Sequence, residues 1–143
     1  MNPTTLPGVH TVSHDGVVLA YARMGEGGLG ENEIQFVTPT EAPFQVGMMR
    51  RPAGTEIRPH RHLQRTYDVR TASEFIYVEA GRVNVGIYTD DWETVETLEL
   101  SAGEWILFTG GGHSLTVSDD AQLIEVKQGP YPGDGLAKVF APG

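Results

Sequence analysis

The sequence predicts an all-β protein with little helix, and three observations lead to this expectation. Apolar residues mostly recur at every second position or in short runs, as in β-strands, and nowhere at the spacing of a long amphipathic helix. The runs end at Gly, Pro and Asp, which favour turns. The chain of 143 residues contains 18 Gly and 9 Pro, a composition that suits many turns. Many short strands with regular turns indicate a sandwich or a barrel.

The expected strands follow one another along the chain, each bounded by a turn signal. Residues 9–24 predict two strands on either side of a turn at 14–16. Residues 73–91 predict a hairpin that turns at 80–81, and residues 113–129 predict another that turns at 118–120. The other strands are expected in 33–39, in 44–52, and in 96–111 around a turn at 101–103.

Length and composition bound the classes of function. A chain of 143 residues fits one domain, with N-terminal strands over 1–50, central motifs over 51–128 and a tail over 129–143. It has no cysteine, so any metal must be bound by His, Asp or Glu. A net charge of −9 argues against nucleic-acid binding. There is no apolar run of membrane-spanning length and no signal-peptide pattern, so we expect a soluble, cytoplasmic protein with no membrane partner.

Two polar residues open strands that are otherwise apolar on the same face. Side chains at every second position of a strand share a face, so Glu74 lies with Ile76 and Val78. His113 opens a similar run at the start of residues 113–117. We therefore expect Glu74 and His113 to lie at the mouth of an apolar interior.

The stretch 54–81, which contains a pair of histidines, resembles the first sequence motif of the cupin family. That motif runs from a glycine through five residues to His-x-His, then through a gap to a glutamate, six further residues and a glycine. Gly54, His60, His62, Glu74 and Gly81 fill these positions. The gap of eleven residues, 63–73, is longer than cupins usually have. It is compatible with either a lid or a static loop.

A second stretch is similar to the other cupin motif, which leads from a glycine through an apolar run and a tight turn to a histidine. Gly103, the run 104–108, the glycines 110–112 and His113 resemble it, although Thr109 stands where the family has proline. The resemblance implies a jelly-roll barrel, the double-stranded β-helix of cupins. We expect a protein of this type to form a homodimer by burying an edge strand.

The resemblance also implies a bound divalent transition-metal ion, with Fe, Zn, Mn or Ni as candidates. Its expected ligands are His60, His62, Glu74 and His113. Three imidazoles and one carboxylate suit such an ion on chemical grounds alone. A plainer interpretation is also open: both histidines of the pair are surface residues of a basic loop, and Glu74 caps a strand.

Positive charge is concentrated beside the histidine pair. Six of the ten basic side chains lie between residues 50 and 70: Arg50, Arg51, Arg58, Arg61, Arg65 and Arg70. Guanidinium groups suit carboxylate or phosphate recognition, so Arg58, Arg65 and Arg70 are expected to contact an anionic small molecule. Tyr67, in the gap after the histidine pair, is the other expected contact. Pairing with the protein's own carboxylates is an equal alternative. Glu125 and Lys127 also share a strand face, and two interpretations are open: one of them reaches the cavity, or the face is an outer one, which we favour.

Three functions are compatible with these residues. The leading hypothesis is a metal-dependent cupin enzyme acting on a compact anionic metabolite by dioxygenation, isomerisation or decarboxylation. A second is a metal-independent sugar-nucleotide isomerase or epimerase, in which His60 or His62 moves a proton as the catalytic acid or base. A third is a ligand-binding or regulatory cupin that is not an enzyme.

Overall fold

The computed structural model describes residues 8–25 and 27–143, and its architecture is all-β. Strands take up 46% of it and helix 3%, which confirms the fold class expected from the sequence at this level. No helix in these two ranges has the length and apolarity needed to cross a lipid bilayer. The elements are β1 (Val9–His14), β2 (Val17–Arg23), β3 (Ile34–Phe36), β4 (Gly47–Met49), β5 (Glu74–Tyr88), β6 (Thr94–Ser101), β7 (Trp105–Phe108), β8 (Gly112–Lys127) and α1 (Asp134–Ala137).

The first hairpin forms where the sequence predicts it. β1 and β2 pair antiparallel, and Asp15 and Gly16 connect them. Both connecting residues have positive φ, 49° and 77°, which is the geometry of a two-residue type I′ turn. Asp and Gly are the residues that tolerate these angles, so local chemistry alone determines this turn.

β5 and β8 are each one long bent strand, so the hairpins predicted at 80–81 and 118–120 are wrong. The two strands pair with each other from end to end, from Glu74 with Lys127 to Tyr88 with Gly112. Their register shifts three times between Val78 and Val83, opposite the second predicted turn. Extra residues of this kind bend a strand and increase its twist without reversing it. The turn signals therefore mark a shared bend.

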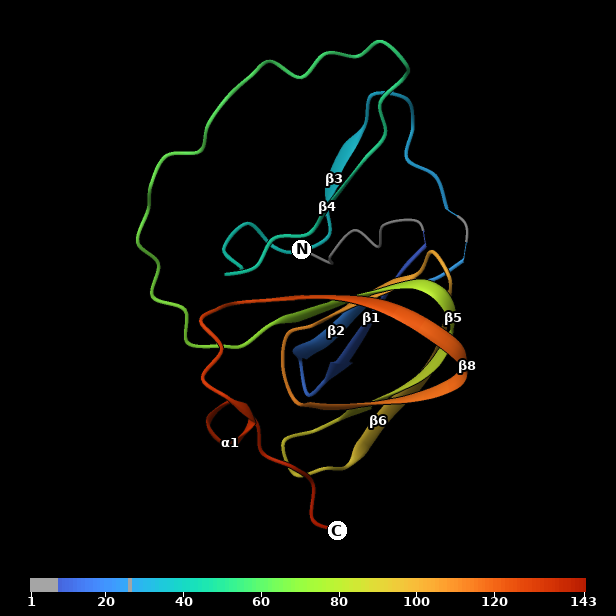
Figure 1. Cartoon of the computed structure of the whole chain (residues 1–143), viewed down its shortest axis with the longest axis vertical. Helices are drawn as coiled ribbons and strands as arrows, with labels where there is room; N and C mark the ends of the chain where they lie inside the picture. The colour runs from blue at the N-terminus through green and yellow to red at the C-terminus, as the bar shows by residue number, and fades with distance from the viewer. Residues whose placement is uncertain (1–7, 26) are drawn as a thin grey trace.

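The bend curls the main sheet into half of a barrel. The strand order is β1-β2-β7-β5-β6, with β8 along the other side of β5. The first half of β5 pairs with β7, and its second half pairs with β6. The curl brings the edge strands β1 and β6 together, where His10 Nε2 lies 2.7 Å from Glu96 Oε1. Figure 1 shows β8, in orange, arching around one side of the body with both of its ends on the opposite side.

Alternating side chains divide the apolar core into two clusters, one on each face of the curled sheet. The inner cluster includes Ile76 and Val78 of β5 together with residues from β1, β2, β6 and β7. The outer cluster includes Trp105 and Leu107 of β7, covered by Val37, Phe44, Val46 and Met48 from the segment that contains β3 and β4. The inner surface of β8 is less well covered than that of its neighbours, because Leu115 and Val117 are exposed.

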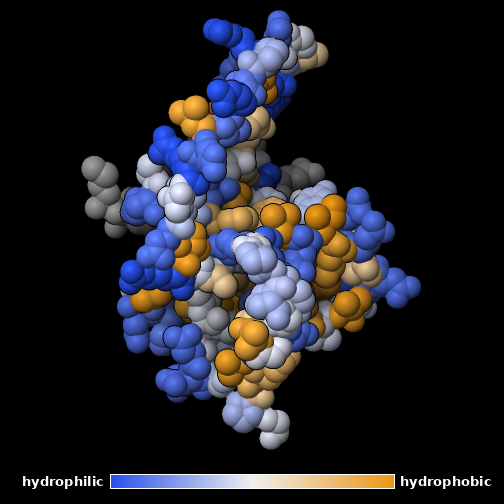
Figure 2. All heavy atoms as spheres, turned by 60° about the vertical axis from the view of Figure 1, so that its left-hand side comes forward, coloured by the Kyte–Doolittle hydropathy of each residue, from blue (hydrophilic) through white to orange (hydrophobic). Residues whose placement is uncertain are grey.

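Residues 52–72, which we call the arm, connect β4 to β5 without contributing to either cluster. Every residue of the arm is exposed and none is in a helix or strand. Figure 1 shows the arm, in green, passing wide of the sheets, and Figure 2 shows a narrow and largely hydrophilic projection above the body on that side. Its root is fixed, since Ser73 N donates to Gln128 Oε1 at 2.8 Å.

Candidate functional site

The structure brings Glu74 and His113 together, although they are 39 residues apart in the sequence. Glu74 is the first residue of β5 and His113 the second residue of β8. Glu74 Oε1 lies 3.5 Å from His113 Nε2, and both side chains are partly buried, with 20% of Glu74 and 29% of His113 exposed. The imidazole also stacks on the Phe108 ring, with 3.8 Å between centroids and 6° between planes. This stacking and the carboxylate hold His113 in one orientation.

The surroundings of Glu74 favour its charged form. Contact with the His113 side chain lowers the pKa of Glu74 below its ordinary value, and burial opposes this effect. The positive charge of Lys127 lowers the pKa further. A carboxylate is therefore retained at the mouth of an apolar interior, where an unpartnered one would be costly.

Glu125 and Lys127 face this site, so the outer face expected for them is wrong. In the register of β5 with β8, Glu125 pairs with Ile76, a member of the inner cluster, and Lys127 pairs with Glu74. Directly paired residues of an antiparallel sheet share a face, so both side chains point inward. Lys127 Nζ lies 3.0 Å from Glu125 Oε1. The sequence pattern alone could not tell which face these two side chains occupy, because the pairing of Glu125 with Ile76 decides it.

These groups line an open cleft of about 1600 Å³. Its walls come from the start of β5, both ends of β8, the root of the arm and the tail after β8. The lining mixes apolar with charged side chains, among them Phe108, His113, Glu125 and Lys127. Small-molecule sites commonly occupy about 300–1,000 Å³, so a compact ligand would fill only part of this cleft, beside its converging charged groups.

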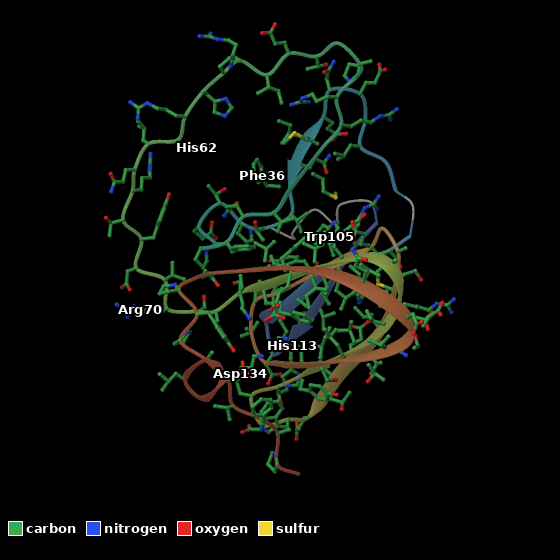
Figure 3. All side chains as sticks on the ribbon, viewed as in Figure 1. Phe36, His62, Arg70, Trp105, His113 and Asp134 are labelled. Atoms are coloured by element: carbon green, nitrogen blue, oxygen red, sulfur yellow. The ribbon has the colours of Figure 1, made fainter. Side chains whose placement is uncertain are left out.

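His60 and His62 lie on the arm, away from Glu74 and His113. Figure 3 shows His62 far from the body in which His113 lies. The two arm histidines contact each other, with 5.4 Å between ring centroids, and His60 Nδ1 bonds to the Arg58 carbonyl oxygen at 2.8 Å. Over residues 8–25 and 27–143, no group of three or more His, Cys, Asp or Glu is close enough to hold an ion. The four expected ligands thus form two separate pairs.

The residues expected to bind an anionic ligand are divided in the same way. Arg58, Arg65 and Tyr67 are exposed on the arm. Arg70, at the root of the arm, lines the cleft and lies 3.1 Å from Asp68. Lys127, which the sequence did not single out for this role, pairs with Glu74 across the β5–β8 ladder and lines the same cleft.

The pKa shift of Glu74 predicts a loss of stability in acid. Folding lowers this pKa, so the stabilisation is complete above the unfolded-state value of about 4.3 and disappears as pH falls through the folded-state pKa. The difference in free energy of unfolding between wild type and Glu74→Gln should therefore narrow as the pH is lowered from 6 to 3. Urea titrations with a chelator present measure this difference at each pH. Parallel pH profiles for the two proteins would contradict it.

Comparison with known proteins does not assign the site. No protein-family model matches the chain, and no curated protein or solved structure with which it was compared matches it either. A function for this site must therefore be inferred from its residues and their geometry.

Proposed function

We propose that this chain is a small metal-binding protein of the cupin type that acts as an enzyme on a compact anionic metabolite. The observation that carries the proposal is the convergence of Glu74 Oε1 and His113 Nε2 at 3.5 Å in the cleft. Metal–ligand bonds of about 2.0–2.2 Å place two neighbouring donor atoms roughly 3–3.5 Å apart. The separation is long for a hydrogen bond and suits two ligands of one ion.

The arm supplies the other two ligands in this proposal. The bond between His60 Nδ1 and the Arg58 carbonyl oxygen orients the ring and leaves Nε2 free to ligate. His62 lies beside it with an exposed ring. Docking of the arm at the cleft therefore completes a set of three imidazoles and one carboxylate. Such a set favours Fe, Zn, Mn or Ni.

The residues around the pair have separate roles in the proposed reaction. A bound ion at this position supplies Lewis-acid activation of a substrate oxygen atom. The inner cluster excludes water from the far side of the cleft. Lys127 and Arg70 line the cleft and attract an anionic substrate, and the arm brings Arg58 and Arg65 with it. Dioxygenation, isomerisation and decarboxylation all fit these roles.

A second candidate is metal-independent proton transfer, which the Glu74–His113 contact favours specifically. A carboxylate beside an imidazole orients the ring and stabilises its charged form, as required of a catalytic base. The structure would then assign the role to His113, and the sequence-based hypothesis for His60 and His62 would not be needed. The reaction in this second candidate is still the epimerisation or isomerisation of a sugar nucleotide, with His113 as the acid or base.

Metal content separates the two candidates. Wild type purified after expression with iron, zinc, manganese and nickel should carry about one ion per chain. His62→Ala and Glu74→Gln should each weaken binding more than about tenfold, since changes around a metal site commonly cost that much. His14→Ala is the matched control, because His14 is also an exposed histidine but lies in the first hairpin. Elemental analysis after dialysis measures each protein.

The outcomes are distinct. A wild-type protein without metal contradicts the leading proposal and leaves proton transfer by His113. If the His62→Ala variant binds metal as well as wild type does, the arm does not supply a metal ligand. Loss of metal in the His14→Ala control would mean that the ion is bound elsewhere.

A further inference from the structure

The outer edge of β8 is an unpaired edge of the sheet. In the part of the chain that the structure describes, β8 pairs with β5 on one side and with no strand on the other. Two apolar side chains of its inner face are exposed beside this edge, Leu115 at 36% and Val117 at 57%. A long unpaired edge with apolar neighbours is a template for another extended chain.

The arm has the properties of the chain that would fill it. It is extended, and its apolar side chains are exposed, with Leu63 at 70% and Ile57 at 60%. Its hydrogen bonds, apart from those at the root, join arm residues to each other, such as Thr55 to Pro52. Four arginines and two acidic residues give the arm a charge of +2, which leaves the rest of the chain at −11. Opposite charge therefore favours contact between an arm and a body.

Both ends of the arm are held to its own body, and its root lies beside the end of its own β8. At one end, Arg51 Nη1 donates to the Glu33 carbonyl oxygen, and at the other end Ser73 is bonded to Gln128. Between these points the arm leaves its own body, as Figures 1 and 3 show. In this conformation the β8 edge within its reach belongs to another molecule.

We propose that two copies of this chain exchange arms, each arm adding a strand to the β8 edge of the other copy. The exchange is reciprocal, so a two-fold axis relates the copies and both edges are filled. Each copy contributes an arm of 21 residues and a β8 edge of 16 residues, which is enough to supply the roughly 20–30 residues a side of a stable interface. Resting on the proposed function, this places His60 and His62 of one copy beside Glu74 and His113 of the other. The metal site is then shared between subunits.

Complementation between two defective variants tests this sharing. One variant is His60→Ala/His62→Ala, which lacks the arm ligands, and the other is Glu74→Gln/His113→Ala, which lacks the body ligands. Each alone should bind no cobalt(II), and both should keep the wild-type circular dichroism spectrum. Co-expressed with different tags and purified through both, the heterodimer has one intact site under arm exchange, or about half an ion per chain. Cobalt absorption and elemental analysis measure it.

The failures of the two proposals are distinguishable. Wild type with one ion per chain and a heterodimer with none would show that each chain builds its own site, which overturns the exchange and leaves the proposed function intact. Absence of metal from wild type overturns the shared site together with the proposed function. Light scattering then tests arm exchange by itself. Ile57→Asp/Leu63→Asp should convert a dimer to a monomer, while Val17→Asp, at a 59% exposed position of the first hairpin away from the cleft, should not. A monomeric wild type at micromolar concentration, or a dimer unaffected by the arm changes, overturns the exchange.

Discussion

Replacing Gly81 by alanine is expected to lower the free energy of unfolding by about 2–5 kcal/mol. Gly81 lies at the shared bend of β5 and β8 with φ +80°, a conformation that costs other residues about 1–2 kcal/mol. A Cβ there would overlap the Asp120 carbonyl oxygen and lie 2.7 Å from the Ala121 Cα. Backbone atoms of a paired strand cannot move aside easily, so overpacking adds about 1–3 kcal/mol. Urea unfolding monitored by circular dichroism measures the loss.

Gly103→Ala is the matched control for this experiment. Gly103 also has a positive φ, +88°, but nothing lies within 4 Å of the position of its Cβ. It should lose only the conformational part, about 1–2 kcal/mol. If both variants lose the same free energy of unfolding, the close contact between β5 and β8 at the bend adds nothing to the cost of Gly81→Ala.

Leu100→Ala should destabilise the protein by about 2–5 kcal/mol, the range for buried leucine truncated to alanine. Leu100 lies on β6, pairs with Val83 and is 0% exposed within the inner cluster. The cavity would form on one side of Val83, which pairs with Leu100 of β6 and, on its other side, with Val117 of β8. Leu136→Ala, at a position 84% exposed, should change the free energy of unfolding by less than about 0.5 kcal/mol. A similar loss in both variants would mean that this cluster is not a packed core.

Local sequence signals predicted those features that depend on neighbouring residues. The turn at Asp15 and Gly16 follows from two residues that accept positive φ. The alternation along β5 correctly separated Ile76 and Val78 from Phe75 and Tyr77, which pack in different clusters. In both cases one strand or one turn contains all the necessary information.

Features that depend on pairing between distant segments were not predictable in this way. A glycine with positive φ in an alternating run suits a reversal or a bend equally well, and the register of β5 with β8 decides for Gly81. The same register turns Glu125 inward, which its own strand could not reveal. The cupin resemblance grouped His60 and His62 with Glu74, but residues 52–72 lack the regular alternation that would specify a strand partner. Their place in an assembled site stays a prediction, as does the cytoplasmic location.

The central position of β5 has a consequence for the folding rate. All three of its partners, β6, β7 and β8, come later in the chain, and Glu74 pairs with Lys127, 53 residues away. Forming a contact of such long sequence separation first costs the chain entropy of closing a large loop. The stabilising interactions form only afterwards, so folding through such contacts is slow. Until β8 arrives, β5 has an apolar face and an unpaired edge exposed to other nascent chains. Aggregation during biosynthesis therefore competes with the docking of this one late strand.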